Sequence, residues 1–528
     1  MAQGLIGPLH TASLNLNRRG SFMKRRSGFT LVEILVATAI SLIMLGAVVA
    51  VFASVMQSIN QARAVLETSD RLRSAAELLR ADLKGLTVIP VPPRDPANNE
   101  GYFEYTEGPI GQNGQIRPFA GAHPLAVVNL DDLDAAGNPY QDSTVGDNDD
   151  ILMFTTRSTG RPFVGRCLVS GQPTTIESDV AEVAWFVRGN RLYRRLRIVA
   201  PKAMALCDVN ANGRLDPAEW IPANDTGAVN FNRYYDVAVH FDRNAGGWVF
   251  STLGDLTKPE NRYAHLIGDP LNPASFPFHP HRAGWQPLGL PTLAESASAG
   301  AATTWLTSGL LPALSLTSLA APLDKWDLWT NPYPVAEVDP QTGLLRTVVD
   351  PQTGLLRTLE QLYRESEDLV LTNVVAFDVK IWDPTAPIGA VQTGGVVRPG
   401  DLGFSLASTA VGRGAYVDLA YAPTTNPSVF SGVPLAKTRL ASAGLAVYDT
   451  WSSHYEKDGI DQDGVGGVDT GTDGFDNDND GLVDEFDEWE APPPYPAPCR
   501  GIQITIRVFE PDSRQLRQVT IMQDFLPK

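Results

Sequence analysis

Two segments of the chain carry carboxylate and amide side chains at regular intervals. The first runs from Asp208 to Glu219 and places side-chain oxygens at positions 1, 3, 5, 9 and 12, with Gly213 at position 6. A hard cation such as calcium takes six to eight oxygen ligands, and this spacing curls the backbone around one ion. The sequence therefore predicts a calcium site with these ligands: Asp208, Asn210, Asn212, Arg214 (through its carbonyl), Asp216 and Glu219.

The second segment, from Asp476 to Asp487, repeats this spacing with more charge. Gly481 again stands at position 6. Five carboxylates this close together repel one another strongly unless a cation neutralises them. The predicted calcium ligands are Asp476, Asp478, Asp480, Leu482 (through its carbonyl), Asp484 and Asp487.

The flanks of the two segments differ. The first resembles an EF-hand loop, although Pro201 shortens any entering helix. The second follows the non-helical run Gly471–Gly474 and looks more like a thrombospondin-type calcium loop. Asp461, Asp463 and Asp469 form a third, irregular candidate. Extracellular calcium is near millimolar, so even weak loops would fill. The alternative is a set of Asx-rich turns without an ion.

The charge balance and the motifs exclude some function classes. The chain has 42 Lys and Arg against 60 Asp and Glu, a net charge of −18, and residues 458–490 hold thirteen acidic and no basic residues. This balance argues against nucleic acid as a partner. The sequence contains no Gly-x-Ser-x-Gly elbow, no Gly-Lys phosphate loop and no His-Glu-x-x-His pair, so we do not expect an enzyme.

The three cysteines are Cys167, Cys207 and Cys499. An odd number allows one disulfide plus a free thiol, or no disulfide. We interpret them as small buried residues. The alternative is a single Cys167–Cys207 bridge formed outside the cytoplasm.

A lone carboxylate, Glu33, stands at the start of a membrane-length apolar run. Residues 34–62 contain no charge over 29 positions, and roughly 20 helical residues cross a bilayer core. We predict a transmembrane segment at 34–56. Upstream basic residues place its start in the cytoplasm; they are Arg18, Arg19, Lys24, Arg25 and Arg26. A carboxylate in lipid needs a partner or a mechanism.

The helix is expected to continue beyond the membrane segment with an amphipathic half. Apolar residues recur at helical intervals: Leu66, Leu72, Ala76, Leu79, Leu83 and Leu86. The first interrupting proline is Pro90, so one helix over 29–89 is predicted, roughly 85 Å long.

The sequence Arg26-Ser-Gly28 followed by Phe29-Thr-Leu-Val-Glu33 resembles the amino terminus of type IV prepilins and pseudopilins, with their class III signal and methylation motif. The resemblance implies a leader peptide over 1–28, cleavage between Gly28 and Phe29 by a prepilin peptidase, and N-methylation of Phe29. It also implies that Glu33 pairs with the terminal amine of a neighbouring subunit. Met23 is a more typical start, so residues 1–22 are expected to be an artefact of start-codon assignment.

The remainder, 94–528, is expected to form a globular, β-rich head. Strands are predicted at 151–155, 181–187, 191–199, 235–241, 248–251, 370–382, 502–509 and 518–525. Residues 255–345 lack periodicity and are predicted to be a loosely structured insertion. An 11-residue unit is duplicated over 338–359 and is expected to form a surface hairpin. The acidic segment 458–490 is expected to bind calcium.

A long helix packed on an antiparallel sheet defines an α+β class and resembles the pilin fold, here with large loop insertions and calcium loops. The segment from Arg73 to Leu86 and the closing strand pair look most like those of PilW-type or J-type minor pseudopilins. The resemblance implies a structural subunit of a type IV pilus or a type II secretion pseudopilus. The implied partners are the prepilin peptidase, other pilins and the inner-membrane assembly platform. The chain would be single-pass in the inner membrane, with its head periplasmic or extracellular. The alternative is a membrane-anchored, calcium-dependent adhesin or binding module.

Overall fold

The computed structural model describes part of the chain, and most of the described residues lie after Arg63. The described residues are 29–107, 150–188, 191–216, 219, 234–242, 244–245, 247–263, 347–349, 356–358, 367–390, 395–399, 401, 404, 409–419, 446–461, 466–485 and 488–525. The chain divides into two compact units, a helix unit of Met1–Arg63 and a head unit of Ala64–Lys528. The expected leader, 1–28, lies outside the described residues.

Helix α1 spans Leu31–Lys84, 54 residues, and is long and apolar enough to cross a membrane by length and composition. It ends before the expected limit at Ile89, because the chain turns at Gly85 to pass close to strand β2 (Ile151–Arg157). A Cβ on Gly85 would lie 2.1 Å from the carbonyl oxygen of Arg157. Leu86 then forms a bridge with Thr156. Close backbone approach therefore stops the helix, rather than the later prolines.

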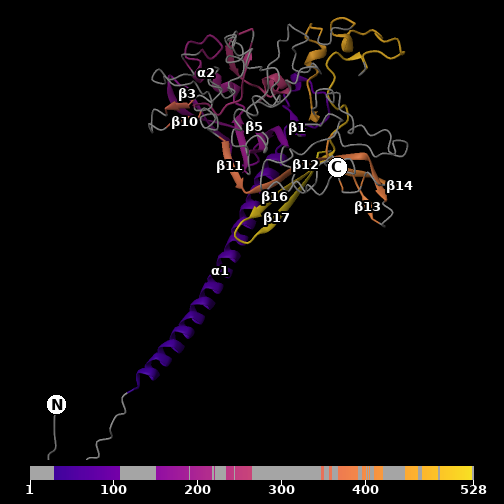
Figure 1. Ribbon diagram of the computed structural model, residues 1–528. Coiled ribbons are helices and arrows are strands. Elements are labelled where there is room, and N and C mark those ends of the chain that lie inside the picture. The colour runs from indigo at the N-terminus through magenta and orange to yellow at the C-terminus, as the bar shows by residue number, and fades with distance from the viewer. Residues whose placement is uncertain are drawn as a thin grey trace, which may run out of the picture. The chain divides into compact units, whose positions relative to one another are not determined.

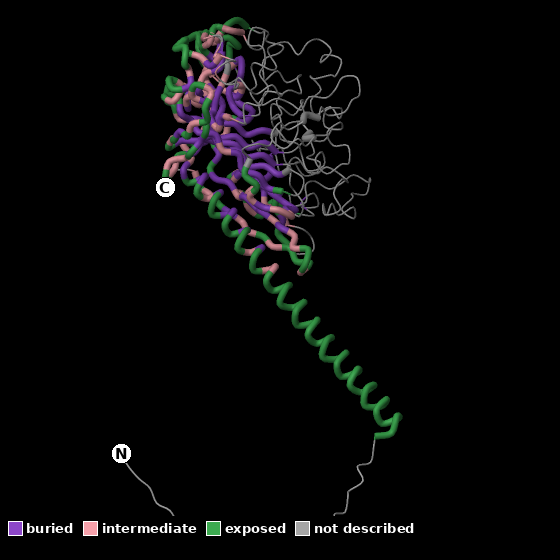
Figure 2. Tube along the Cα trace, turned by 90° about the vertical axis from the view of Figure 1, so that its left-hand side faces the viewer, coloured by how far each residue is buried: buried purple, intermediate pink, exposed green. Residues whose placement is uncertain are grey.

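The two parts of α1 have different surroundings. Every residue of the helix unit from Phe29 onward is exposed, whereas the part of α1 in the head unit is partly buried (Figure 2). Its buried residues are Thr68, Leu72, Ala75, Ala76, Leu79, Asp82 and Leu83. Leu66, expected on this face, is exposed.

A buried ion pair fixes α1 within the head unit. The guanidinium of Arg194 donates two hydrogen bonds of 2.8 Å to the carboxylate of Asp82, and the indole of Trp185 donates a third at 2.9 Å. Both charged side chains are almost completely buried. Such paired donors are required, because an unpaired carboxylate in this position would be strongly destabilising.

The larger sheet has six strands, all antiparallel, in the described part of the chain (Figure 1). Its order is β11 (Glu367–Thr372), β6 (Arg191–Ile198), β5 (Val180–Arg188), β2, β1 (Phe103–Glu107) and β15 (Ala446–Asp449). Strands β5 and β6 form the hairpin expected around Gly189-Asn190, and Arg188 pairs with Arg191.

A second antiparallel sheet contains β16 (Gly501–Glu510) and β17 (Gln515–Asp524), the last strands that the structure describes. Strands β13 (Val396–Val397) and β14 (Thr409–Val417) pair with β12 (Val374–Ala390), which also pairs with β16, and β16 pairs with β17. The single strand predicted over 370–382 is wrong, because Asn373 adopts a left-handed conformation with φ 58°. Asparagine tolerates this region better than most residues. The chain bends there and passes from β11 in one sheet to β12 in the other.

Three two-stranded sheets complete the described part of the head unit. They are β3 (Phe163–Val169) with β4 (Gln172–Ser178), β7 (Val239–Asp242) with β8 (Gly247–Phe250), and β9 (Thr347–Val349) with β10 (Leu356–Thr358). The last pair joins the two copies of the duplicated unit. Thr347 pairs with Thr358, the same position in each copy, which confirms a hairpin.

Short helical turns connect these strands. Within the residues that the structure describes, they are α2 (Met204–Cys207) and the 3-10 turns Pro96–Asn98, Pro201–Ala203, Asp255–Thr257, Pro259–Asn261, Ser453–Glu456 and Thr470–Thr472. Of the expected insertion 255–345, the structure describes 255–263 and the strand residues 347–349 just after it. Arg262, at the start of that segment, is buried and donates to Glu104 at 2.8 Å and to Asp449 at 2.6 Å. The long α1 helix and the antiparallel sheets confirm the α+β class.

Candidate metal centre and assembly segment

The first acidic loop, Asp208–Glu219, begins where α2 ends. The carboxylate of Asp208 accepts hydrogen bonds from the main-chain N–H groups of Asn212, at 3.1 Å, and Gly213, at 2.7 Å. These bonds curl the loop back toward its first residue. Ala211 and Gly213 take positive φ values of 56° and 86°, and the glycine at position 6 allows this turn without a side-chain clash.

Glu219 closes the first acidic loop from the far end. Its carboxylate accepts N–H groups from Val209 at 2.8 Å, Asn210 at 3.1 Å and Asp216 at 2.9 Å. The loop folds so that its twelfth residue reaches back to its second and third. The predicted ligand carboxylates at positions 1, 9 and 12 are thereby held on one short loop.

The first acidic loop also contains its own positive charge. The Arg214 guanidinium lies 2.9 Å from the Asp216 carboxylate, which also accepts the side-chain amides of Asn210 at 2.9 Å and Asn212 at 2.7 Å. The hydrogen bond from Asn210, followed by those from Asn212 and Arg214, lowers the pKa of Asp216. The Asp216 carboxylate, at position 9, therefore already has hydrogen-bond donors and a positive charge from the protein itself.

The second acidic loop, Asp476–Glu488, repeats the backbone hydrogen bonds of the first. The Asp476 carboxylate accepts N–H groups from Asp480 at 3.1 Å and Gly481 at 2.9 Å, the same two positions that bond to Asp208 in the first loop. Asn479 and Gly481 have positive φ values of 63° and 96°. Two segments far apart in the sequence thus adopt one local conformation, because both carry Asp at position 1 and Gly at position 6.

The residue that closes the second acidic loop is Glu488, one position later than the prediction. Its carboxylate accepts the N–H groups of Asn477, Asp478 at 3.1 Å and Asp484 at 2.8 Å, the counterparts of the three groups that bond to Glu219. Glu488 is 7% exposed. Asp487, the predicted ligand, lies outside the described residues.

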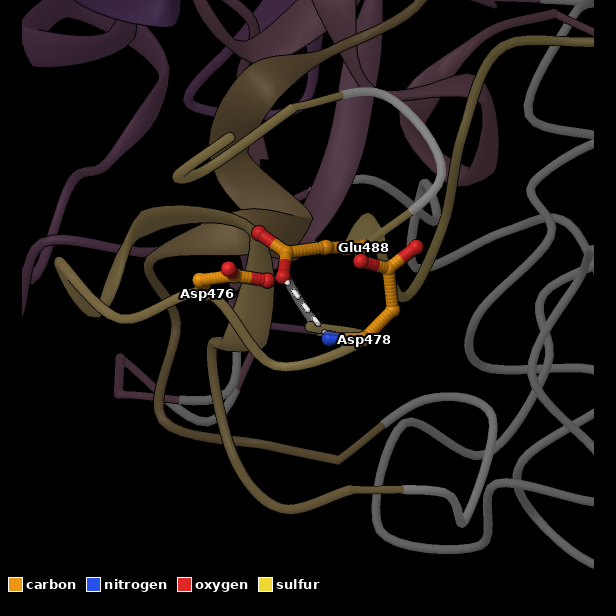
Figure 3. Close-up of side chains that lie close together, drawn as sticks. All are labelled: Asp476, Asp478 and Glu488. Atoms are coloured by element: carbon orange, nitrogen blue, oxygen red, sulfur yellow. Dashed lines mark hydrogen bonds between the residues drawn. The ribbon is translucent and has the colours of Figure 1, made fainter. Parts of the chain in front are cut away.

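Carboxylate oxygens of the second acidic loop form two groups that share Asp478. One oxygen each from Asp476, Asp478 and Glu488 lie within 4.8 Å of one another, and Figure 3 shows the Glu488 carboxylate between the two aspartates. A second group combines Asp478, Asp480 and Glu485. Groups of this kind could hold a hard cation, since calcium and magnesium prefer oxygen ligands. Among the described residues, no such group of acidic side chains occurs in the first loop.

Glu485 has an unusual environment within this cluster. Both of its carboxylate oxygens are inaccessible to solvent, and neither accepts a hydrogen bond from another described residue. Desolvation, with the nearby charges of Glu488, Asp480 and Asp478, raises the pKa of Glu485. A bound cation would neutralise the negative charge of the Glu485 carboxylate.

The spacing counted from Asp476 missed both Glu485, at position 10, and Glu488, at position 13. The available signal was residue type. Glutamate is preferred at the closing position of calcium loops, and in this segment Glu488, not Asp487, has that side chain. The local repeat also extends upstream: Gly459 donates to Asp469 and Gly474 donates to Asp484 in the same way. Asp463, in the third candidate, lies outside the described residues.

The start of α1 contains the predicted assembly residue. Glu33 accepts the main-chain N–H of Thr30 at 2.8 Å and its hydroxyl at 2.9 Å, while the Thr30 hydroxyl accepts the N–H of Glu33 at 3.2 Å. This reciprocal pair is a capping box, which satisfies donors at a helix start. Glu33 therefore has a local structural role in addition to any intermolecular one. Gly28 lies outside the described residues, and Phe29 is 82% exposed.

The first half of α1 presents an apolar surface that nothing in the helix unit covers. Its most apolar 18-residue window has no buried residue. Exposed side chains of this size and continuity mark a surface that meets lipid or other protein. Together with its uncharged length, this fits a membrane-anchored protein.

Comparison with known proteins identifies this same segment. A family model described as the prokaryotic N-terminal methylation motif matches residues 23–49. No curated protein and no solved structure matches the chain. The match covers the predicted cleavage point, Glu33 and the first part of α1. It supports a type IV pilin-like family, whose class III signal implies processing by a prepilin peptidase and assembly with other pilins.

Proposed function

We propose that the chain is a minor pilin or pseudopilin, a structural subunit of a type IV pilus or type II secretion pseudopilus and not an enzyme. The observation that carries the proposal is the methylation motif at 23–49, placed directly on an exposed apolar helix. The helix would sit in the inner membrane through residues 34–56 before assembly, with the head periplasmic or extracellular. PilW-type or J-type subunits are the subtype proposed.

The proposed assembly contact follows from the chemistry of the processed end. Cleavage between Gly28 and Phe29 would create an amine, which would be methylated. A carboxylate inside the membrane gains most from a cation, and the amine of a neighbouring subunit would supply it to Glu33. The partners would be the prepilin peptidase, the assembly platform and other pilins, contacted through residues 29–60.

We also propose that both acidic loops bind calcium and that the ion stabilises the head. Support comes from the convergence of Asp476, Asp478 and Glu488 and from the buried oxygens of Glu485, which accept no hydrogen bond from another described residue. In the second acidic loop the ligand set proposed from the sequence gains Glu488. The test is calcium titration by calorimetry and thermal melting. A melting temperature that neither calcium nor chelator changes would refute this part.

The assembly proposal can be tested without disturbing the helix start. Glu33→Gln keeps an acceptor for the Thr30 N–H and so preserves the capping box, but it removes the charge. Glu33→Ala removes both. We expect both variants to be processed and membrane-bound, and to disappear from sheared filaments, measured by immunoblot of filament and membrane fractions. Glu67→Gln, the same change at an exposed position of α1, is the control and should assemble normally.

The possible outcomes separate the roles of Glu33. If Glu33→Gln assembles normally while Glu33→Ala does not, the residue acts as a helix cap and the charge pairing is wrong. If both assemble normally, Glu33 is not the assembly contact. If the wild-type chain stays in the membrane fraction and never enters filaments, the membrane-anchored adhesin is favoured. Mass spectrometry of the mature amino terminus should find N-methylated Phe29.

A further inference from the structure

Two of the three cysteines share one buried cluster. Cys167 lies in β3, Cys207 is the last residue of α2, and both are 0% exposed. Helix α2 packs against β3, and the two cysteines belong to a core that also contains Tyr235 and Trp248. Residues separated by about 40 positions are therefore brought together by the tertiary structure.

The two thiols are in hydrogen-bond contact. The Cys207 thiol donates a hydrogen bond to the Cys167 sulfur, and both residues are free thiols in the structure. Cys499 belongs to the other, larger core, where its thiol contacts the carbonyl oxygen of Gly501 at 3.7 Å. The structure thus separates the cysteines into a facing pair and a solitary residue.

We propose that Cys167 and Cys207 form an intramolecular disulfide in the mature protein and that Cys499 remains a thiol. This inference rests on the proposed function for one premise, that the head lies outside the cytoplasm, where disulfides persist. The contact between the two sulfurs supplies the other premise.

The bond forms by thiol–disulfide exchange with a disulfide-bonded dithiol oxidoreductase. The Cys167 thiolate attacks one sulfur of the oxidant, releasing the other as a thiolate. Cys207, after losing its proton, attacks the Cys167 sulfur and displaces the oxidant. The chain loses two protons and two electrons, and the oxidant becomes a dithiol. Because both cysteines are inaccessible in the folded head, the exchange occurs before this core closes.

The disulfide has a structural consequence for the first acidic loop. Cys207 directly precedes Asp208, whose carboxylate organises the loop. A bond to β3 would fix the entry of the loop to a strand and would close about 40 residues of chain in the unfolded state.

The test counts thiols in the full chain extracted from membranes. The chain is denatured, its free thiols are trapped with a maleimide near neutral pH, because the thiolate is the reacting form, and the digest is analysed by mass spectrometry. We expect one maleimide per chain, on Cys499, and a cross-linked peptide pair containing Cys167 and Cys207. After reduction, three maleimides are expected. Cys499→Ala should show none before reduction and two after it, whereas Cys207→Ser should show two in both conditions.

Three maleimides on the unreduced membrane chain, or a cross-link that includes Cys499, overturns the proposal. A second arm identifies the failed premise, by refolding the reduced full chain with oxidised glutathione. No Cys167–Cys207 bond in that arm means that the sulfur contact is wrong. A bond formed only there means that the location of the head is wrong. The same digest reports methylated Phe29, so failure of the pilin assignment is read independently.

Discussion

The first and second acidic loops fold with the same backbone hydrogen bonds but neutralise their carboxylates differently. In the first, Arg214 and two asparagine amides satisfy the carboxylate at position 9. The second loop has Leu482 at position 7, aspartates in place of the asparagines, and no basic residue within 458–490. The conformation thus depends on the Asp and Gly positions that both share, whereas the demand for a cation depends on the residues that differ.

This contrast predicts different calcium affinities. The number of charged ligands and the rigidity of the loop set the dissociation constant of such sites. The second acidic loop should bind calcium more tightly, because an ion there replaces repulsion among carboxylates. In the first acidic loop an ion must compete with Arg214.

The largest expected effect is the loss of the tighter site. Asp476→Ala should weaken calcium binding to the second acidic loop about 100-fold, equivalent to about 2.7 kcal/mol, because Asp476 both faces the cluster and organises the backbone. Isothermal titration calorimetry should retain only the weaker site. Asp208→Ala should remove that weaker site instead.

The matched control for these variants is Asp512→Ala, an exposed aspartate in the turn between β16 and β17. It should bind calcium like the wild type. If Asp208→Ala removes the tighter site, the order of affinities inferred from the charges is reversed.

A smaller effect should distinguish Glu488 from its neighbour. Glu488→Ala leaves three main-chain N–H groups without their acceptor, which should lower the free energy of unfolding by about 1–3 kcal/mol even without calcium. Chemical denaturation in the presence of chelator measures this loss. Asp487→Ala should leave the stability unchanged. A larger loss in Asp487→Ala would restore the twelve-residue loop predicted from the sequence.

The smallest expected effect comes from removing the positive charge of the first acidic loop, which should bring its calcium affinity closer to that of the second. Arg214→Gln removes the cation beside Asp216, 2.9 Å away, and should raise the calcium affinity of the first acidic loop about fivefold, given about 1 kcal/mol between unit charges 4 Å apart in water. Calorimetry with the Asp476→Ala background isolates this site. Arg413→Gln, at an exposed position of β14, is the control, and an equal gain there would mean that only net charge matters.

Local patterns predicted much of the fold. The helix start, the β5–β6 and β16–β17 hairpins and the hairpin of the duplicated unit depend on residues close together in the sequence. The strand expected over 370–382 is wrong because the prediction carried one strand through the polar pair Thr372-Asn373, which separates two apolar runs. The left-handed turn at Asn373 sends the two halves to different sheets, and pairing partners distant in sequence decide this.

The spacing of Asp and Gly in each acidic loop is a local property, so the sequence alone indicated how each loop begins to curl. The apolar run from Ile34 and the motif around Glu33 likewise depend only on consecutive residues. The preference for glutamate at the closing position pointed to Glu488 in the sequence, but only the folded loop shows its carboxylate reaching three backbone amides. The tertiary structure also decided that Cys167 faces Cys207, since α2 and β3 meet only when the head packs. Short-range hydrogen bonds and hydrophobic length are visible in sequence; contacts that require two distant segments to meet are not.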